Sequence, residues 1–269
     1  MLVIGENINA TNKTIAQAII TRDEEFLANL AIAQASAGAD FIDVNVGSGH
    51  GSIQDEAEAM TWLVGVIQSA SDKPLTIDSD SPVVIKAALQ KYQGDKLILN
   101  SVNAELERLE SVGSIAAAHQ AGVVALTMGT GGIPDNVEER VAASDIIMTH
   151  LTGLGMKPEQ IYFDPLVLPI AVDTAQGLVT LKTMEQIKLR HPDARTVMGL
   201  SNISYGLPGR KLVNRAFLLM AAYAGLDAVI IDPLDAKAIS LIKTADMLIG
   251  KDQSCRGYLR AHRKGAIVD

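Results

Sequence analysis

The sequence predicts a (β/α)8 barrel, and three observations support this fold class. Short runs rich in Val, Ile and Leu alternate with longer amphipathic segments along the whole chain. The alternation produces eight strand-like runs in 269 residues, and a barrel of this type takes about 250 residues. Polar residues follow each of the runs. An open, doubly wound sheet is the main competitor, but the Gly-x-Gly-x-x-Gly turn typical of that fold does not follow the first run.

Each predicted strand is a short apolar run that is continuous rather than alternating. Parallel strands of α/β proteins are buried on both faces, so continuous apolar character is what they require. In chain order the runs cover residues 2–5, 41–46, 75–77, 97–99, 123–128, 161–163, 196–200 and 228–231.

The segments between these runs carry helix start and stop signals. Ser81 and Pro82 predict a helix start, because proline fits the first helical position, and Gly94 is predicted to end that helix. Asp135 with Glu138 predicts a capping box at the start of another helix. Glycine can adopt the left-handed conformation that ends many helices. It is predicted to do so before three of the strands, at Gly38, Gly122 and Gly225.

Composition and charge limit the class of protein. We predict a single domain over residues 1–269, because no linker or change of composition interrupts the chain. The chain has 31 acidic and 23 basic residues, and its net charge of −8 is spread along its length. This balance argues against nucleic acid as a partner, because nucleic-acid binding needs a clustered basic face. Cys255 is the only cysteine, which excludes a disulfide within the chain.

Targeting signals are not apparent in the sequence. The N-terminus has no basic segment before an apolar stretch. The longest apolar or glycine run, 216–226, is shorter than the roughly 20 residues of a membrane span. We therefore expect a cytoplasmic protein that does not associate with a membrane.

Polar side chains stand at the carboxyl end of every predicted strand. In a barrel these ends meet at one mouth, where such enzymes place their active sites. A single polar strand end is usually a loop or helix-capping residue, but a full ring of buried carboxylates and amides needs partners. The ring consists of Glu6 and Asn7, Asn45, Asp78, Asn100, Thr127, Asp164, Ser201 and Asn202, and Asp232.

The residue types in this ring exclude some chemistries and favour another. No predicted strand ends in lysine, which disfavours a Schiff-base aldolase. No His-x-His pair stands at a strand end, which disfavours the zinc hydrolases of the barrel class. Asp78, Asp164 and Asp232 could hold magnesium, but their spacing does not require it, and no metal is predicted. Carboxylates and amides together suit a flat heterocycle with an amino-pyrimidinone edge, the pattern of guanine and pterin.

Seven short motifs at the strand ends form a set that spans nearly the whole chain. They are Gly5-Glu6-Asn7-Ile8-Asn9, Asp43-Val44-Asn45-Val46-Gly47, Ile77-Asp78-Ser79, Asn100-Ser101-Val102-Asn103-Ala104, Leu126-Thr127-Met128, Asp164-Pro165-Leu166-Val167-Leu168-Pro169 and Gly199-Leu200-Ser201-Asn202-Ile203-Ser204. In this order they resemble the methyltetrahydrofolate:corrinoid protein methyltransferase family. The resemblance implies a pterin-binding (β/α)8 barrel. It also implies transfer of a methyl group between N5 of tetrahydrofolate and the cobalt of a corrinoid.

The resemblance also implies roles for matching residues. Asp78, Asn100 and Asp164 would hold the pterin ring, with help from Gly199 and Ser201. Asn202 would be the catalytic residue, hydrogen-bonded to N5. Weaker folate contacts are expected from Glu6, Asn45, Tyr205 and Arg210.

Two of the weaker contacts need comment. Tyr205 stands where the family pattern leads us to expect an amide. Arg210 with Lys211 would meet the glutamate tail of folate, although a solvated basic loop explains these two residues equally well.

The family resemblance implies partners and substrates as well. The substrates would be tetrahydrofolate or 5-methyltetrahydrofolate and a corrinoid such as cobalamin, and the chain would form a homodimer. The corrinoid would be carried by a separate partner protein, because the Asp-x-His-x-x-Gly pattern of a cobalamin-binding module is absent. The direction of transfer stays open, and the chain would serve as the second methyltransferase of a demethylation pathway if it takes methyl groups from the corrinoid.

Three other functions compete with this interpretation. A dihydropteroate-synthase-like enzyme would carry a Thr-Pro-Asp-Ser-Phe loop, whereas residues 9–13 read Asn-Ala-Thr-Asn-Lys. A non-catalytic folate-binding subunit would show the same polar ring, so the sequence does not exclude it. A phosphate-binding isomerase would use glycine-rich backbone near the last strands, where only Gly206 and Gly209 offer weak support.

Overall fold

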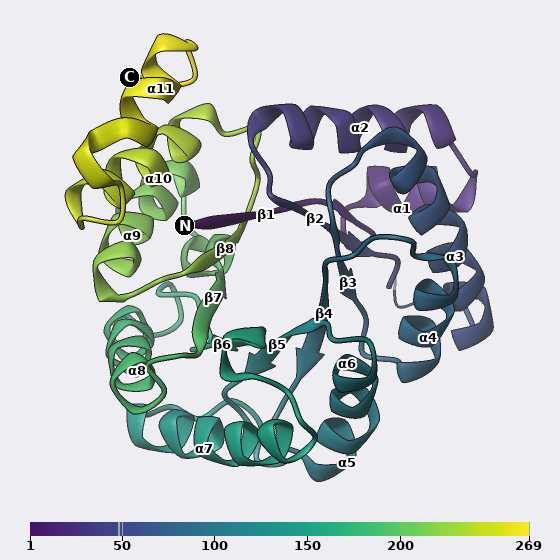
Figure 1. Ribbon diagram of the computed structural model, residues 1–269, viewed down its shortest axis with the longest axis horizontal. Helices are drawn as coiled ribbons and strands as arrows, with labels where there is room; N and C mark the ends of the chain where they lie inside the picture. The colour runs from purple at the N-terminus through teal and green to yellow at the C-terminus, as the bar shows by residue number, and fades with distance from the viewer. Residues whose placement is uncertain (48, 50, 269) are drawn as a thin grey trace.

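Eight parallel strands close into a barrel, in the same order in space as in the sequence (Figure 1). This is the computed structural model of the chain, and it describes residues 1–47, 49 and 51–268. The fold confirms the predicted class, and the last strand pairs with the first to complete the barrel. The strands are β1 Leu2–Asn9, β2 Phe41–Asn45, β3 Leu75–Asp78, β4 Leu97–Val102, β5 Gly122–Leu126, β6 Ile161–Asp164, β7 Arg195–Gly199 and β8 Ala228–Ile231.

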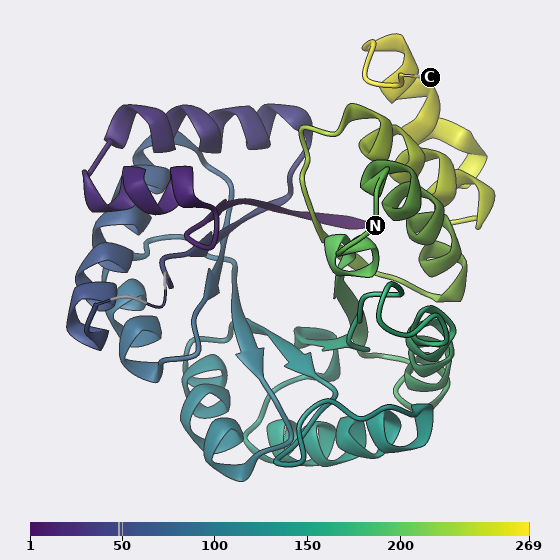
Figure 2. The same ribbon diagram turned by 180° about the vertical axis from the view of Figure 1, so that it is seen from behind.

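Helices surround the barrel on the outside (Figures 1 and 2). They cover the apolar outer face of the strands, and the main core cluster lies between the two layers. The α-helices are α1 Lys13–Ile20, α2 Glu24–Ala37, α3 Ile53–Ala70, α4 Pro82–Lys91, α5 Leu106–Arg108, α6 Ser114–Ala118, α7 Val137–Gly153, α8 Gln176–Arg190, α9 Arg210–Ala224, α10 Ala236–Leu248 and α11 Arg256–Arg263. Within the described ranges, no helix has both the length and the apolar character to cross a bilayer.

The predicted helix signals are partly wrong in position. Helix α4 does begin at Pro82 after Ser81. It ends at Lys91, because the following residue, Tyr92, is already extended, so Gly94 is not its stop.

The N-cap of α7 is Asn136, one residue later than predicted, and the predicted capping box is not formed. Asn136 accepts a hydrogen bond from the backbone N–H of Glu139 at 2.8 Å, and its Nδ2 donates to the Glu139 carboxylate at 2.9 Å. Asp135 and Glu138 have the same spacing as this pair, and the spacing alone does not choose between them.

The predicted glycine conformations are confirmed at two positions and wrong at the third. Gly38 and Gly225 follow α2 and α9 with φ of +109° at each, the left-handed conformation that ends a helix. Gly122 instead begins β5, and Gln120 takes the left-handed conformation with φ of +52°. A side chain at Gly122 would press on Tyr162, with an added Cβ only 3.0 Å from the ring, so close packing inside the barrel explains this glycine.

The barrel interior changes from apolar to polar along the strands. A buried apolar cluster forms its floor, with Ile4, Phe41, Ile98, Val124, Tyr162, Val197 and Ala228. Residues two positions apart on a strand point to the same side. The interior positions two residues beyond the floor include Glu6, Asp43, Asn100 and Asp164. The floor therefore closes the barrel below, and polar groups line its mouth.

Strand β1 runs to Asn9, beyond the predicted end at Gly5, and its pairing is irregular. Its register against β2 shifts between Gly5 and Ile8. A β-bulge of this kind bends the strand and re-aims the side chains within it. The irregular stretch contains Glu6 and Asn7, and both line the cavity described next.

Candidate active site

A cavity of about 1020 Å³ opens at the carboxyl ends of the strands. The resemblance assigned a site role to several of its lining residues, and these come from β1, β3, β4 and the β7–α9 segment. They are Glu6, Asp78, Asn100, Gly199, Ser201, Asn202 and Arg210. The barrel therefore brings residues 6 and 210 together at one mouth, as the prediction requires.

Three predicted site residues do not line this cavity. Asn45 lies behind Asp78, and its Nδ2 donates to Asp78 Oδ2 at 2.9 Å. Asp164 is 9% exposed at the end of β6, and its Oδ1 accepts the backbone N–H of Leu166 at 2.8 Å. Tyr205 is 67% exposed and lies outside the cavity lining.

Five carboxyl groups line the cavity, and three of them, those of Glu6, Asp43 and Asp78, have raised pKa values. Burial raises the pKa of Glu6, and nearby Asp232 raises it further, while a hydrogen bond from Ser201 Oγ at 2.8 Å opposes the rise. Burial also raises the pKa of Asp78, and the hydrogen bond from Asn45 opposes this. Such a cluster favours protonated carboxyl groups, because removing ions from water and placing like charges together are both unfavourable.

Asp43 is the functional candidate that sequence reasoning missed. Its side chain is 2% exposed on β2 and lines the cavity. Burial raises its pKa well above the usual range, the charges of Asp78 and Glu6 raise it further, and a hydrogen bond from Asn100 opposes the rise. Within the described residues its Oδ1 has no hydrogen-bond partner. The available signal was an acidic residue inside the apolar run Phe41-Ile42-Asp43-Val44, where a buried charge requires a partner.

Asp164 has a different environment from the other carboxyl groups. Burial raises its pKa to about 6, while the N–H of Leu166 and the charge of Arg140 oppose the rise. Its backbone is fixed as well, because Thr127 Oγ1 donates to the Asp164 carbonyl at 2.9 Å. Asp164 can therefore change its protonation state near neutral pH.

Two arginines hold the loops of the mouth through backbone carbonyls, and their charges also oppose the rise in the pKa values of Asp78 and Glu6. Arg108 donates from Nη2 to the Ser79 carbonyl at 2.9 Å, from Nε to the Ser101 carbonyl at 2.8 Å, and to the carbonyl of Asp80. Arg210 donates from Nη2 to the Ser201 carbonyl at 2.8 Å. These contacts fix the backbone next to Asp78, Asn100 and Asn202, the residues that face the cavity.

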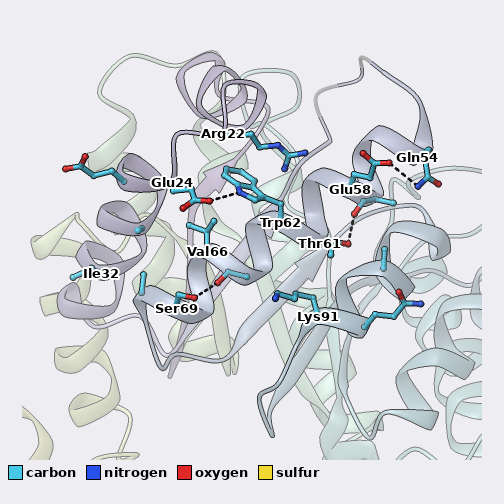
Figure 3. Close-up of a pocket in the computed structure, with 17 residues that line it drawn as sticks. Arg22, Glu24, Ile32, Gln54, Glu58, Thr61, Trp62, Val66, Ser69 and Lys91 are labelled. Atoms are coloured by element: carbon cyan, nitrogen blue, oxygen red, sulfur yellow. Dashed lines mark hydrogen bonds between the residues drawn. The ribbon is translucent and has the colours of Figure 1, made fainter.

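A second, larger hollow lies outside the barrel, over α2, α3 and α4 (Figure 3). Its volume is about 1230 Å³, and we call it the outer groove. Trp62 Nε1 donates to the Glu24 carboxylate at 3.1 Å, and the Arg22 guanidinium lies 4.5 Å from the centre of the Trp62 ring. No predicted site residue lines the outer groove. The mouth cavity, with its converging carboxyl and amide groups, is therefore the better candidate for chemistry.

The mouth cavity offers hydrogen-bond donors and acceptors side by side. Amide side chains donate and accept side by side, and carboxyl groups with raised pKa values accept when ionised and donate when protonated. No group of three or more His, Cys, Asp or Glu side chains in the described ranges is placed to hold a metal ion.

Solved structures with the same fold include dihydropteroate synthases. The enzyme from Xanthomonas albilineans with 4-aminobenzoic acid superposes with a TM-score of 0.71 at 20% identity, over 94% of this chain and 93% of that one. The enzyme from Stenotrophomonas maltophilia gives 0.66 at 20% identity, over 94% and 93% of the two chains. At these identities the likeness concerns the fold alone.

Similar sequences carry more information. The methylcorrinoid:tetrahydrofolate methyltransferase of Eubacterium limosum is 34% identical over 99% of this chain and 98% of its own length. The methionine synthase of Mycobacterium tuberculosis is 32% identical over 86% of this chain, which spans 20% of that longer protein. The family model described as "pterin binding enzyme" matches residues 5–232. That range runs from the glycine before Glu6 to the aspartate after β8, so the chain belongs to the family of pterin-binding enzymes.

Proposed function

We propose that this chain transfers a methyl group between N5 of tetrahydrofolate and the cobalt of a corrinoid carried by a separate protein. The proposal rests on one observation: three residues at the ends of different strands line the same cavity, namely Asp78, Asn100 and Asn202. The similarity to the Eubacterium limosum enzyme over nearly the full length of both chains supports it.

Recognition of the pterin ring falls to the side chains of the mouth. Asp78 would accept from an N–H group of the ring, and Asn100 would donate and accept beside it. Asp164 ends β6 outside the lining of the cavity, and its part in holding the ring is the one that the family resemblance implies. Asn45 supports this arrangement, because it holds Asp78 Oδ2 and leaves the other oxygen for the ligand. Each charge-assisted hydrogen bond of this kind contributes about 1.5–3 kcal/mol.

Asn202 is the proposed catalytic residue. A tertiary amine is a poor leaving group, so transfer from methyltetrahydrofolate requires N5 to gain positive character. The Asn202 carbonyl can stabilise protonated N5 without placing a full charge in the cavity. Gly199 lies next to the Asn202 side chain, since a Cβ added at Gly199 would lie 3.4 Å from Asn202 Nδ2.

The bond between N5 and the methyl carbon breaks, its electron pair stays on N5, and the carbon bonds to Co(I), which is thereby oxidised to Co(III). In the reverse direction N5 attacks the methyl carbon of methyl-Co(III), and the same residues act on the same atoms.

Asp43 is the proposed reservoir for the proton on N5. Its raised pKa keeps the carboxyl group protonated where an ordinary aspartate is ionised. Asp43 lines the cavity, and among the described residues its Oδ1 has no hydrogen-bond partner. Asn100 links it to the ring-binding residues. Asp43 would act as the general acid from within the barrel.

The remaining assignments rest on the family resemblance. Arg210 and Lys211, which line the cavity at the start of α9, supply positive charge for the glutamate tail of folate. A cytoplasmic location and a homodimer also belong to this proposal. Sedimentation analysis of the purified chain tests the dimer, and a monomer at micromolar concentration would contradict it.

Turnover separates the proposal from its rivals. The purified chain is incubated with methylcobalamin and tetrahydrofolate, and formation of methyltetrahydrofolate is followed with time. We expect catalytic turnover that Asn202→Ala reduces. Binding of tetrahydrofolate without methyl transfer would favour the non-catalytic subunit. Condensation of a pterin pyrophosphate with 4-aminobenzoate would favour the synthase-like alternative.

A further inference from the structure

Arg140 is a wholly buried charged residue outside the mouth cavity. It lies on α7 with 0% of its surface exposed, and it is among the largest fully buried side chains of the described residues. Burying a guanidinium is unfavourable unless its N–H groups find partners. The proposed mechanism does not use this residue, so its position needs a separate explanation.

The Arg140 guanidinium donates to neutral oxygens on three segments. Its Nη1 donates to the carbonyls of Pro165 and Leu166, both at 2.8 Å. Its Nη2 donates to Gln176 Oε1 at 2.8 Å, and its Nε to the Pro134 carbonyl at 2.9 Å. The planar fork of arginine suits such a set of fixed acceptors, whereas a lysine has one nitrogen and no fork.

The loop held by Arg140 follows directly on Asp164. Leu166 has φ of +65°, a left-handed conformation that a branched side chain rarely adopts. Its N–H bonds Asp164 Oδ1, and its carbonyl accepts from both Arg140 and Thr180 Oγ1, the latter at 2.9 Å. The strained turn is thus held from two helices, and it in turn orients the Asp164 carboxyl group.

We infer that Arg140 is a positioning residue of the pterin site: through the backbone of residues 165–166 it fixes Asp164 so that its second carboxyl oxygen is presented to the ligand. This inference rests on the proposed function, since it gives Asp164 a role in binding the pterin ring. In the part of the chain that the structure describes, Oδ2 of Asp164 makes no hydrogen bond.

A double-mutant cycle tests the inference. Tetrahydrofolate binding is measured by calorimetry for the full chain, Arg140→Lys, Asp164→Asn and the double variant. Arg140→Lys keeps the charge and loses the fork, and we expect the Kd to rise about tenfold. In the Asp164→Asn background the same change should raise the Kd less than about twofold, because Arg140 acts through Asp164. Additive effects would overturn the inference.

Turnover adds a second readout that general damage to the fold would not reproduce. Arg140→Lys should raise the KM for tetrahydrofolate while kcat at saturating folate stays within about twofold, because Asn202 follows another strand. The matched control is Arg190→Lys on α8, whose arginine pairs with Asp145 near the surface, and neither parameter should change.

A milder variant covers the case in which Arg140→Lys does not fold. Thr180→Val removes one hydrogen bond to the same Leu166 carbonyl without changing the size of the side chain. We expect a Kd increase of about threefold that again disappears in the Asp164→Asn background. If Asp164→Asn alone leaves binding unchanged, the proposed pterin site fails. If Asp164→Asn weakens binding and the folded Arg140 or Thr180 variants do not, only the positioning inference fails.

Discussion

At the scale of single residues, the proposed mechanism separates the amide that acts on N5 from the groups that hold the ring. Asn202→Ala should lower kcat about 100-fold with little change in the Kd for folate, because its hydrogen bond strengthens only as N5 changes charge. Asp78→Asn and Asn100→Ala should mainly raise the Kd. Steady-state kinetics with calorimetry on all three variants checks the split, and unchanged kinetics in all three would contradict the site assignment.

Asp43 gives the reaction a dependence on pH. Its raised pKa keeps the protonated form present at higher pH than in an ordinary aspartate, so transfer from methyltetrahydrofolate should fall as the pH rises through that pKa. Asp43→Asn cannot donate a proton, and we expect a flat profile with kcat lowered about 100-fold. A variant profile with the same slope as that of the unchanged chain would assign the proton to another source.

Asp164 links stability to pH with a definite sign. Its pKa is raised from 3.8 to about 6, so the folded chain binds the proton more tightly than the unfolded chain. The stability that this group contributes is fully present below its unfolded pKa and is lost as the pH rises through about 6. The loss amounts to about 3 kcal/mol for a shift of roughly two pKa units.

Asp164→Asn should remove this loss. Relative to the unchanged chain, the variant should gain about 2–3 kcal/mol in the free energy of unfolding between pH 4 and pH 8. Urea unfolding across this range measures the difference, and a constant difference would contradict the assignment. Folate binding should show the opposite dependence on pH. The unchanged chain should lose affinity for folate below about pH 6, because the ionised, hydrogen-bond-accepting form of Asp164 disappears. Asp164→Asn should bind folate weakly at every pH in this range.

At the scale of elements, apolar runs located every strand, because buried parallel strands need continuous hydrophobic character. The same pattern did not identify Asp43 as a site residue, because it does not show which residues of an apolar run face the inside of the barrel. Helix starts were harder to place where two candidate caps adjoin: Asp135 and Asn136 each have a glutamate three residues later. The end of β1 at Asn9 could not be predicted, because local hydrophobicity does not encode a change of register against β2.

The irregular part of β1 also depends on a glycine. An added Cβ at Gly5 would collide with Gln34 Oε1, the atom that accepts the N–H of Asn7 at 3.1 Å. Gly5→Ala should therefore displace the wholly buried Gln34 and cost about 2–3 kcal/mol of stability. Chemical denaturation measures the cost. The control is Gly153→Ala in α7, where nothing lies within 4 Å, and this variant should be neutral or slightly more stable.

At the scale of the whole molecule, repetition of eight strand and helix units made the closed barrel predictable. Closure brings residues that are far apart in sequence to one mouth, and this is why Glu6 and Ser201 are hydrogen-bonded although 195 positions separate them. The sequence does not show how deeply each strand end lies, so it predicts that Asp164 holds the pterin ring together with Asp78 and that Asn45 makes a weaker folate contact. In the structure Asn45 supports Asp78, and Asp164 depends on the loop that Arg140 holds.

Two hollows of similar size compete as the ligand site, and equilibrium titration with 5-methyltetrahydrofolate decides between them. Calorimetry is applied to the unchanged chain, to Asn100→Ala in the mouth cavity and to Trp62→Phe in the outer groove. We predict one ligand per chain, with affinity lost about tenfold or more in Asn100→Ala and unchanged in Trp62→Phe. Binding that survives the first substitution and fails with the second would contradict the mouth cavity as the pterin site.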